Sequence, residues 1–255
     1  MSLTKFILRF AAPISRIEDH TTFLFVGPHP DDIEIGAGAT VKKLTETGKQ
    51  VFFLIATDGR FGTEHAACSG DSLVKERQKE ALASANALGV KRVYFLPFSD
   101  GGFYDREELL NAIAKAAGEI QPDVIFAPDP EVHAEAHTDH LNVGNAVKLF
   151  ACFASNPGIM KKRGAKHFSL KAAVFYMTAK PNQIVKLKKR HLDDQLSAIF
   201  DQHITQFPKG DPSAKQIALY LKIRSLNMGL KKAALHGEGF RVTDGLHMHC
   251  LPESD

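Results

Sequence analysis

Short apolar runs alternate with stretches of helical spacing, and this alternation constrains the fold more than any other feature of the chain. The first two runs, residues 22–27 and 51–57, are rich in β-branched and aromatic residues and are continuously apolar. A strand that is apolar on both sides must be covered on both sides, and helical crossovers between parallel strands supply that cover. The sequence therefore predicts an α/β fold with a mostly parallel sheet and helices on both of its faces.

The expected elements follow from these patterns together with glycine and proline stops. We expect strands over residues 22–27, 51–57, 92–96, 124–127, 172–178 and 238–243. We expect helices over residues 33–48, 72–88, 107–120, 141–154, 184–207 and 213–234. Since no linker interrupts the chain, we predict a single domain over 1–255, with 1–20 as a leader or peripheral strand and 180–255 as a mainly helical elaboration.

Composition excludes several classes of protein. The chain is 44% hydrophobic and 24% charged, as globular proteins are, and its net charge of +3 is too small for a dedicated nucleic-acid binder. No apolar run approaches the roughly 18–20 residues of a membrane span. Arg9 interrupts the N-terminal apolar stretch, so we expect no secretion signal. Three widely spaced cysteines argue against a disulfide framework and favour a cytoplasmic setting.

Ligands of an open parallel sheet bind beyond the carboxyl ends of its strands, so the loops there carry the functional argument. The loop after 22–27 reads Pro28-His29-Pro30-Asp31-Asp32. Imidazole and carboxylate together suit zinc, and His29 and Asp32 are spaced to face one ion at a helix start. The alternative is that an aspartate merely caps the following helix. This loop by itself leaves both interpretations open.

The loop after 124–127 reads His133-Ala-Glu135-Ala-His137-Thr-Asp139-His140. His137 and His140 are three residues apart where a helix is expected to begin, so both rings can face one way. A solvated charged loop is the alternative. Taken together, the two loops supply His, Asp and His, which is the three-ligand pattern of a catalytic zinc site with an open position. Fe²⁺ accepts the same ligands.

With these motifs the sequence resembles the LmbE-like (PIG-L) deacetylase family. HPDD follows the first strand and leads into IEIGAGAT, and HTDH lies downstream. Weaker similarity continues through 77–90, Asp100-Gly101, 203–207 and 238–242, so the resemblance spans most of the chain. It implies a Rossmann-like fold and a zinc-dependent hydrolase that removes an N-acetyl group from an N-acetylglucosamine-type amino sugar or its conjugate.

The resemblance also implies a role for each matching residue. It implies that zinc is held by His29, Asp32 and His140. Asp31 is then the general base toward water, and His137 stabilises the oxyanion of the tetrahedral intermediate, with Asp139 holding its ring. An unligated carboxylate beside a metal can accept such a proton, and a histidine opposite the metal can stabilise the developing charge.

Arg77 falls on the apolar stripe of its predicted helix, where a guanidinium needs an acceptor. The resemblance implies that Arg77 contacts sugar hydroxyls, beside Asp100. The alternatives are an ion pair of Arg77 with Glu76 or Glu80, and for Asp100 an ordinary turn position.

Some features depart from the family pattern or suggest other classes of protein. Ile33 stands where many relatives have Glu, with little expected effect. A fourth ligand, such as Cys68 or His65, would favour a non-catalytic zinc-containing binding protein, and an amidase for another N-acyl substrate is a further alternative. Gly36 and Gly38 lack a third glycine and follow two carboxylates, which excludes a dinucleotide loop. The sequence assigns no role to His65, His236, His247 and His249, suggests no nucleic-acid partner, and leaves a homo-oligomer possible.

Overall fold

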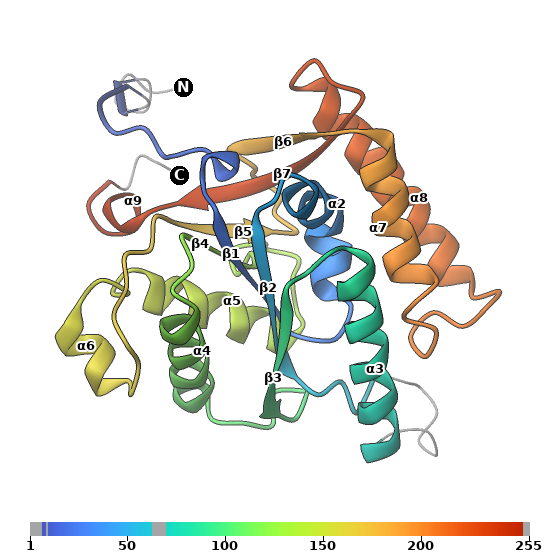
Figure 1. The fold of residues 1–255 in the computed structure, drawn as a ribbon, viewed down its shortest axis with the longest axis horizontal. Coiled ribbons are helices and arrows are strands. Elements are labelled where there is room, and N and C mark those ends of the chain that lie inside the picture. Colours follow the sequence, from blue (N-terminus) through green and yellow to red (C-terminus); the bar gives the residue numbers. More distant parts are fainter. Residues whose placement is uncertain (1–6, 9, 63–69, 252–255) are drawn as a thin grey trace.

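A computed structural model describes residues 7–8, 10–62 and 70–251 of the chain. Seven strands form one sheet in the order β3-β2-β1-β4-β5-β7-β6 (Figure 1). The strands are β1 (Thr22–Gly27), β2 (Gln50–Thr57), β3 (Arg92–Phe98), β4 (Val124–Pro128), β5 (Ala172–Tyr176), β6 (Gln183–Leu187) and β7 (His236–Thr243). The mostly parallel α/β fold is thereby confirmed.

The strand order reverses at β1. This strand pairs in parallel with β2 on one side and with β4 on the other. The parallel part of the sheet runs from β3 to β5, whereas β7 is antiparallel to both β5 and β6. In an open parallel sheet the loops at such a reversal diverge and leave a crevice in which ligands bind. The loops after β1 and β4 are the two with the histidines and carboxylates.

Helices cover both faces of the sheet (Figure 1). One face carries α2 (Asp32–Glu46), α3 (Asp71–Ala87) and α7 (Lys189–Phe200), with α8 (Pro212–Leu230) packed against β7 and α7. The other face carries α4 (Arg106–Ile120), α5 (Thr138–Ala151) and α6 (Pro157–Lys162). The remaining short elements are η1 (Ile17–Asp19) and α9 (Gly245–His249).

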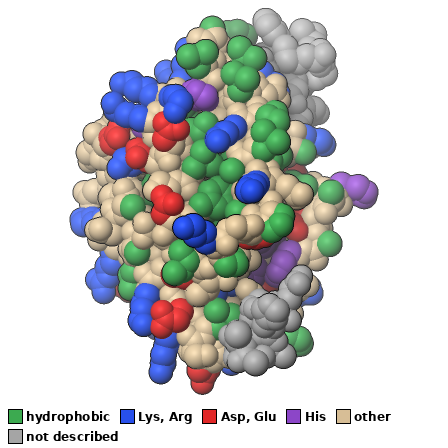
Figure 2. Space-filling view, turned by 90° about the vertical axis from the view of Figure 1, so that its right-hand side faces the viewer, with side chains coloured by type: hydrophobic (Ala, Val, Ile, Leu, Met, Phe, Trp, Pro, Cys, Tyr) green, Lys and Arg blue, Asp and Glu red, His purple; other side chains and the backbone are tan. Residues whose placement is uncertain are grey.

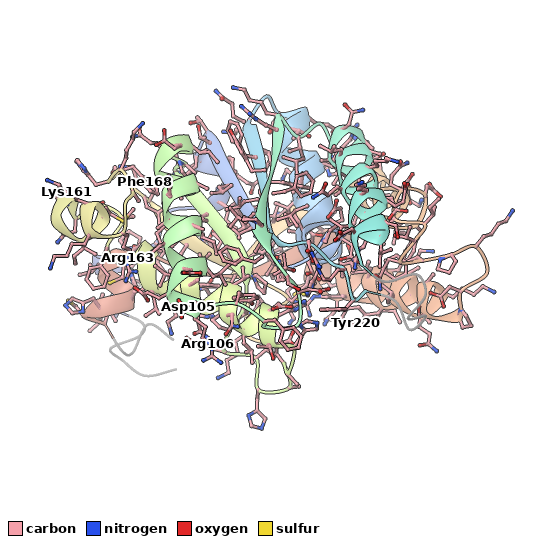
Figure 3. The ribbon with its side chains drawn as sticks, turned by 90° about the horizontal axis from the view of Figure 1, so that it is seen from below. Asp105, Arg106, Lys161, Arg163, Phe168 and Tyr220 are labelled. Carbon is pink, nitrogen blue, oxygen red and sulfur yellow. The ribbon has the colours of Figure 1, made fainter. Side chains whose placement is uncertain are left out.

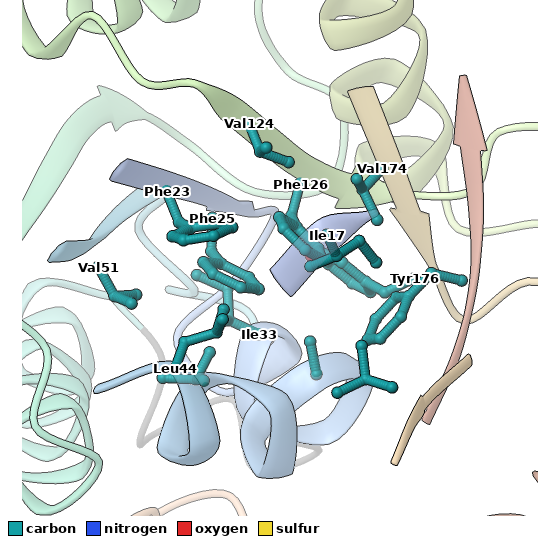
Figure 4. Packing of buried hydrophobic residues seen from close by; sticks show 14 of the residues in the cluster. Ile17, Phe23, Phe25, Ile33, Leu44, Val51, Val124, Phe126, Val174 and Tyr176 are labelled. Carbon is teal, nitrogen blue, oxygen red and sulfur yellow. The ribbon is translucent and has the colours of Figure 1, made fainter. Parts of the chain in front are cut away.

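The core has two parts because successive side chains of β1 point to opposite faces of the sheet. Phe23 and Phe25 join the cluster on the α2 face (Figure 4), and Leu24 and Val26 join the cluster on the α5 face. The rings of Phe25 and Phe126 stack with centroids 4.0 Å apart. Burying each such side chain contributes about 1.5–3 kcal/mol. These contacts hold β1 and β4 side by side directly beneath the crevice.

Two sequence predictions about elements are wrong. The segment expected as a helix over 184–207 begins with the strand β6, and α7 starts only at Lys189. The apolar residues at the start of this segment match helical spacing, but β6 pairs with β7 at the end of the sheet, and that pairing overrides the local pattern. For residues 1–20 only the peripheral-strand alternative is wrong, because the described part contains η1 and no strand, and Ile17 of η1 is buried in the core; the leader stays a prediction.

The outer side of α8 is apolar. Figure 2 faces the side that carries α7 and α8, where hydrophobic side chains gather with Lys and Arg among and around them. Large exposed hydrophobic residues on α8 are Leu219, Tyr220, Ile223, Leu226 and Leu230.

None of the described helices is both long and apolar enough to cross a membrane. Within the described residues, Cys152 and Cys250 are free thiols. The single domain and the homo-oligomer stay predictions.

Candidate metal centre

The candidate site lies beyond the carboxyl ends of β1 and β4. Figure 3 shows the molecule from below, with Asp105 and Arg106 at the start of α4 and Tyr220 on α8 labelled. The site is built from the loop between β1 and α2 and from the loop that leads from β4 into α5. The structure therefore brings together two segments that are more than a hundred residues apart in the sequence.

The glycines at the start of α2 serve packing. A Cβ atom at Gly36 would lie 2.2 Å from Cδ2 of Tyr176, and one at Gly38 would lie 2.9 Å from Cγ of Gln195. Tyr176 is fully buried and donates a hydrogen bond to the carbonyl of Val26 in β1. The close approach of α2 to β5 and α7 fixes where the helix starts and hence where its first acidic residues lie.

Asp32 stands between two histidines. One of its oxygens lies 2.9 Å from Nδ1 of His29 and accepts the backbone N–H of His29 at 2.8 Å. The other lies 3.2 Å from Nε2 of His140. The ligand atoms of these three residues lie within 4.8 Å of one another, and the three side chains are largely buried. A carboxylate flanked by two imidazole nitrogens is a donor set that suits a divalent transition metal.

Each of these histidines has a second carboxylate on its other ring nitrogen. Nε2 of His29 lies 3.0 Å from Asp139, and Nδ1 of His140 lies 3.0 Å from Glu135. A carboxylate can only accept, so it holds the proton on that nitrogen and leaves the opposite nitrogen, the one that faces Asp32, available to a metal ion. Metal-binding histidines in proteins are oriented in this way. The residues present therefore fit a metal ion.

Asp139 is the most heavily bonded carboxylate of the site and is fully buried. It accepts the backbone N–H groups of Gly101 and Gly102 at 2.7 and 2.9 Å and the hydroxyl of Tyr104 at 2.6 Å, besides contacting His29. Its nearest approach to the ring of His137 is 3.8 Å, which is longer than a hydrogen bond. The carboxylate expected to hold His137 therefore holds His29.

The charges of the site are strongly coupled. Burial alone would raise the pKa of Asp32, but the neighbouring His140 and His29 hold it well below its usual range. Burial would lower the pKa of His29, but Asp32 and Asp139 outweigh it and raise the pKa to about 10. Without a metal, His29 therefore carries both ring protons, and a bound cation would replace the one on Nδ1.

Asp31 occupies the N-cap position of α2, but its side chain makes no capping hydrogen bond. Its backbone φ is 136°, a conformation that a side-chain-bearing residue adopts only where the surroundings enforce it. Its carboxylate lies 3.4 Å from the guanidinium of Arg77. Burial raises the pKa of Asp31 to about 6, although Arg77 opposes the shift. The capping alternative is thus wrong for the Asp31 side chain, which is a buried carboxylate beside the metal-binding group.

Arg77 is buried beneath the HPDD loop. It donates to the carbonyl oxygens of Pro30 at 3.0 Å and Gly59 at 3.2 Å, in addition to its ion pair with Asp31. Neither Glu76 nor Glu80 is its partner among the described residues, because Glu76 pairs with Lys79 and Glu80 accepts from Thr205. Only 3% of Arg77 is exposed, which favours a role in positioning Asp31 over contact with a sugar.

Asp100 contacts the loop after β2 two residues beyond the Gly59 carbonyl that Arg77 contacts. It is buried and accepts the backbone N–H of Phe61 at 3.2 Å. Burial raises the pKa of its carboxyl group. Asp100 therefore fixes the loop after β2 against the loop after β3.

His137 is half-exposed and its ring lies beside the rings of His29 and His140, with centroids 4.6 and 5.0 Å apart. Its Nδ1 accepts the backbone N–H of Asp139, so the neutral ring carries its proton on Nε2. Burial and the neighbouring histidines lower the pKa of His137. His137 is thus a neutral hydrogen-bond donor next to the metal-binding group.

Sequence reasoning missed a second buried network behind Asp31. Glu34 accepts the hydroxyl of Ser84 at 2.6 Å and lies 3.3 Å from Nε2 of His203. It also gave Tyr104 and Glu135 no role, although both contact site residues. Only Glu135 carried a signal, since it lies within the histidine-rich loop.

The histidines without a predicted role lie apart from this group or outside the described residues. His65 and Cys68 belong to the undescribed segment 63–69. His236 contacts Ser225, and His247 contacts Asp244. His247 and His249 line a separate cavity of about 240 Å³ next to Arg241.

Comparison with known proteins identifies the family of this chain. The model of the PIG-L family, described as GlcNAc-PI de-N-acetylase, matches residues 24–151. A diacetylchitobiose deacetylase of Thermococcus kodakarensis is 32% identical over 95% of this chain and 94% of its own length. The chain belongs to the PIG-L family.

Other members of the PIG-L family are similar over most of the chain. The structure of an N,N'-diacetylchitobiose deacetylase from Pyrococcus horikoshii, solved with its inhibitor MPG, superposes with a TM-score of 0.87 at 33% identity and covers 96% of this chain and 93% of that one. A 1D-myo-inositol 2-acetamido-2-deoxy-alpha-D-glucopyranoside deacetylase from Kineococcus radiotolerans is 29% identical over 71% of this chain and 58% of its own length. The family predicted from HPDD and HTDH is therefore confirmed.

Proposed function

We propose that this protein is a metal-dependent N-deacetylase that hydrolyses the acetamide of an N-acetylglucosamine-type amino sugar or its conjugate. The observation that carries the proposal is the arrangement around Asp32. Two histidines face this carboxylate, each is oriented by a carboxylate of its own, and a fourth carboxylate, Asp31, lies next to the group without being needed as a ligand.

The ion would be held by His29, Asp32 and His140, and zinc is the metal we propose, with Fe²⁺ as the alternative. When bound, it would act as a Lewis acid on the acetamide carbonyl and make water more acidic. Since the described residues supply three ligands, the set matches a catalytic rather than a closed structural site.

The protein's own residues provide the proton transfers and the charge stabilisation. Asp31 accepts a proton from the attacking water and returns it to the amide nitrogen as the C–N bond breaks, so that acetate and the free amine leave; this task suits a buried carboxylate whose pKa is raised to about 6. Arg77 holds this carboxylate and the preceding carbonyl of Pro30 in place. The Nε2–H of His137 donates to the oxyanion as the carbonyl becomes tetrahedral.

The proposed substrate class is based on the named activities of the relatives. The relatives described above are named deacetylases, and their named substrates contain an acetylated amino sugar. The chain covers nearly the whole length of the Thermococcus protein, so it has room for the same reaction. We propose a small-molecule substrate and, from the unpaired cysteines, a cytoplasmic setting.

The deciding experiment compares metal content with acetate release for wild type and Asp31→Asn. We expect about one metal ion per chain in both proteins and a turnover that falls by roughly 10²–10⁴ in the variant, because Asp31 transfers a proton and does not bind the ion. Asp193→Asn, on the exposed side of α7, is the control and should leave both readouts unchanged. A metal-loaded wild type that releases no acetate from N-acetylglucosamine or its conjugates would favour the binding protein or another amide substrate.

A further inference from the structure

Two exposed phenylalanines from different loops meet at the metal-binding end of the sheet. Phe61 follows β2 and is 52% exposed, and Phe103 follows β3 and is 76% exposed. Their rings make an edge-to-face contact with centroids 6.1 Å apart and an interplanar angle of 81°. Since more than half of each residue is exposed, part of the surface of the pair is open to solvent.

The turn beneath these rings is attached to the metal-binding group. Gly101 and Gly102 both have positive φ, and a Cβ atom at Gly101 would lie 2.9 Å from the ring of Phe103 and 3.8 Å from that of Phe61. The N–H groups of the same two glycines hold Asp139, which contacts His29. The phenylalanine pair therefore sits directly on the turn that orients a metal ligand.

The loop that carries Phe61 is also held by a hydrogen bond. The backbone N–H of Phe61 donates to the buried carboxylate of Asp100, the residue that precedes the glycine turn. The backbone of both loops is therefore held by hydrogen bonds, although more than half of each phenylalanine stays exposed. Ordering two large apolar side chains beside a polar site without burying them is unfavourable unless a ligand covers them.

We propose that Phe61 and Phe103 form a subsite for a neutral pyranose ring linked to the acetylated sugar. One face of a pyranose ring carries C–H groups and is apolar, so it can pack on an aromatic face while its hydroxyls remain in water. The acetylated sugar lies at the metal and the next ring of the substrate lies on the phenylalanine pair. The inference rests on the proposed function and narrows its substrate to an oligosaccharide of at least two rings.

Kinetics with two substrates test the subsite. In the double variant Phe61→Ala/Phe103→Ala, we expect kcat/KM for N,N'-diacetylchitobiose to fall about tenfold, mainly through KM, because two aromatic contacts are lost. For N-acetylglucosamine, which has one ring, kcat/KM should change less than about twofold. Phe61→Tyr/Phe103→Tyr keeps both rings and should restore the wild-type value. Equal losses for the two substrates, or no loss for either, would overturn the subsite.

A matched control separates the subsite from a general loss of surface phenylalanines. Phe153 is 42% exposed and follows the far end of α5, which begins at the site and is 14 residues, or about 21 Å, long. Phe153→Ala should leave both substrates unaffected. A loss for the disaccharide in this variant would contradict the proposal.

A binding measurement keeps the subsite testable if the protein does not deacetylate either sugar. In the Asp31→Asn background, saturation-transfer NMR with N,N'-diacetylchitobiose should show a dissociation constant about tenfold higher after the two alanine substitutions, and N-acetylglucosamine should show no change. No difference for the disaccharide would refute the subsite. Absence of acetate release by the wild type together with this difference would refute the proposed reaction alone.

Discussion

Replacing Asp139 by asparagine tests whether this residue orients the metal ligand His29. The carboxylate receives three N–H or O–H donors, from Gly101, Gly102 and Tyr104, and a fourth contact from the ring of His29. An asparagine side chain has one oxygen and one NH₂ group in the same shape, so one of its two ends must present hydrogens where the carboxylate accepts them.

Either orientation of the amide is unfavourable. If the NH₂ group points toward His29, its hydrogens face the N–H of Gly101, so two donors oppose each other. The NH₂ group also donates to Nε2 of His29, and the proton of the neutral ring then lies on Nδ1, the nitrogen that faces Asp32. With NH₂ turned away, it opposes the N–H of Gly102. One part-buried backbone N–H loses its charged acceptor in both cases, at a cost of about 1–3 kcal/mol of folding stability. Loss of such an orienting carboxylate weakens metal binding by roughly 10–100-fold.

Two measurements check this prediction. Competition with a chelator should give the metal dissociation constant, and urea unfolding of the metal-free protein should give the change in stability. Asp105→Asn is a control in the neighbouring loop, where the side chain caps α4 and asparagine caps equally well. Unchanged metal affinity in Asp139→Asn, with a lowered turnover, would show that Asp139 acts on His137 instead and that the orienting role is wrong.

Variants at three other places in the structure test the roles of the histidines, the packing of α2 and a buried ion pair. His140→Ala should lose the metal, whereas His137→Ala should keep it and lower turnover by roughly 10²–10³, as metal analysis and acetate release would show; equal effects on metal content would contradict the division of roles. Gly36→Ala should destabilise the fold by about 1–3 kcal/mol in urea unfolding because its Cβ would meet Tyr176, whereas Gly158→Ala on α6 should be neutral or stabilising. Arg241→Met should lower the free energy of unfolding by about 3–5 kcal/mol at pH 7, because the substitution leaves the buried carboxylate of Asp129 without its bidentate partner. Burial alone would raise the pKa of Asp129, but Arg241 and Thr178 lower it, so the stabilisation by this ion pair is present above about pH 4 and is lost as the pH falls through the pKa of the folded state. The difference in the free energy of unfolding between wild type and variant should therefore narrow on acidification. A difference that stays constant with pH would refute the pairing.

The parallel sheet and the two site loops could be predicted from the sequence because each depends on local information. A continuously apolar run such as 22–27 has one stable environment, a strand covered on both sides, and the structure places β1 there. The carboxyl ends of parallel strands share one edge of the sheet, so histidines after two such strands lie at that edge, whereas their direct contact depends on the strand order β2-β1-β4, which the structure shows. By contrast, β6 is stabilised by its pairing with β7, about fifty residues later, and no local pattern reports that pairing.

At the start of a helix, the partner of a side chain depends on the direction in which the side chain points from the helix as well as on its distance along the sequence from other residues. Residues three apart on a helix face the same way, and the spacing of His137 and His140 places their rings side by side. Residues two apart point to nearly opposite sides, so Asp139 turns away from His137 toward the glycine turn after β3 and toward His29. At the start of α5 this geometry directs the carboxylate of HTDH away from His137, and the contact with His29 of the other loop depends on tertiary structure. Asp139, the second residue of α5, thereby connects the two loops, because its carboxylate fixes the ring of His29, which follows β1.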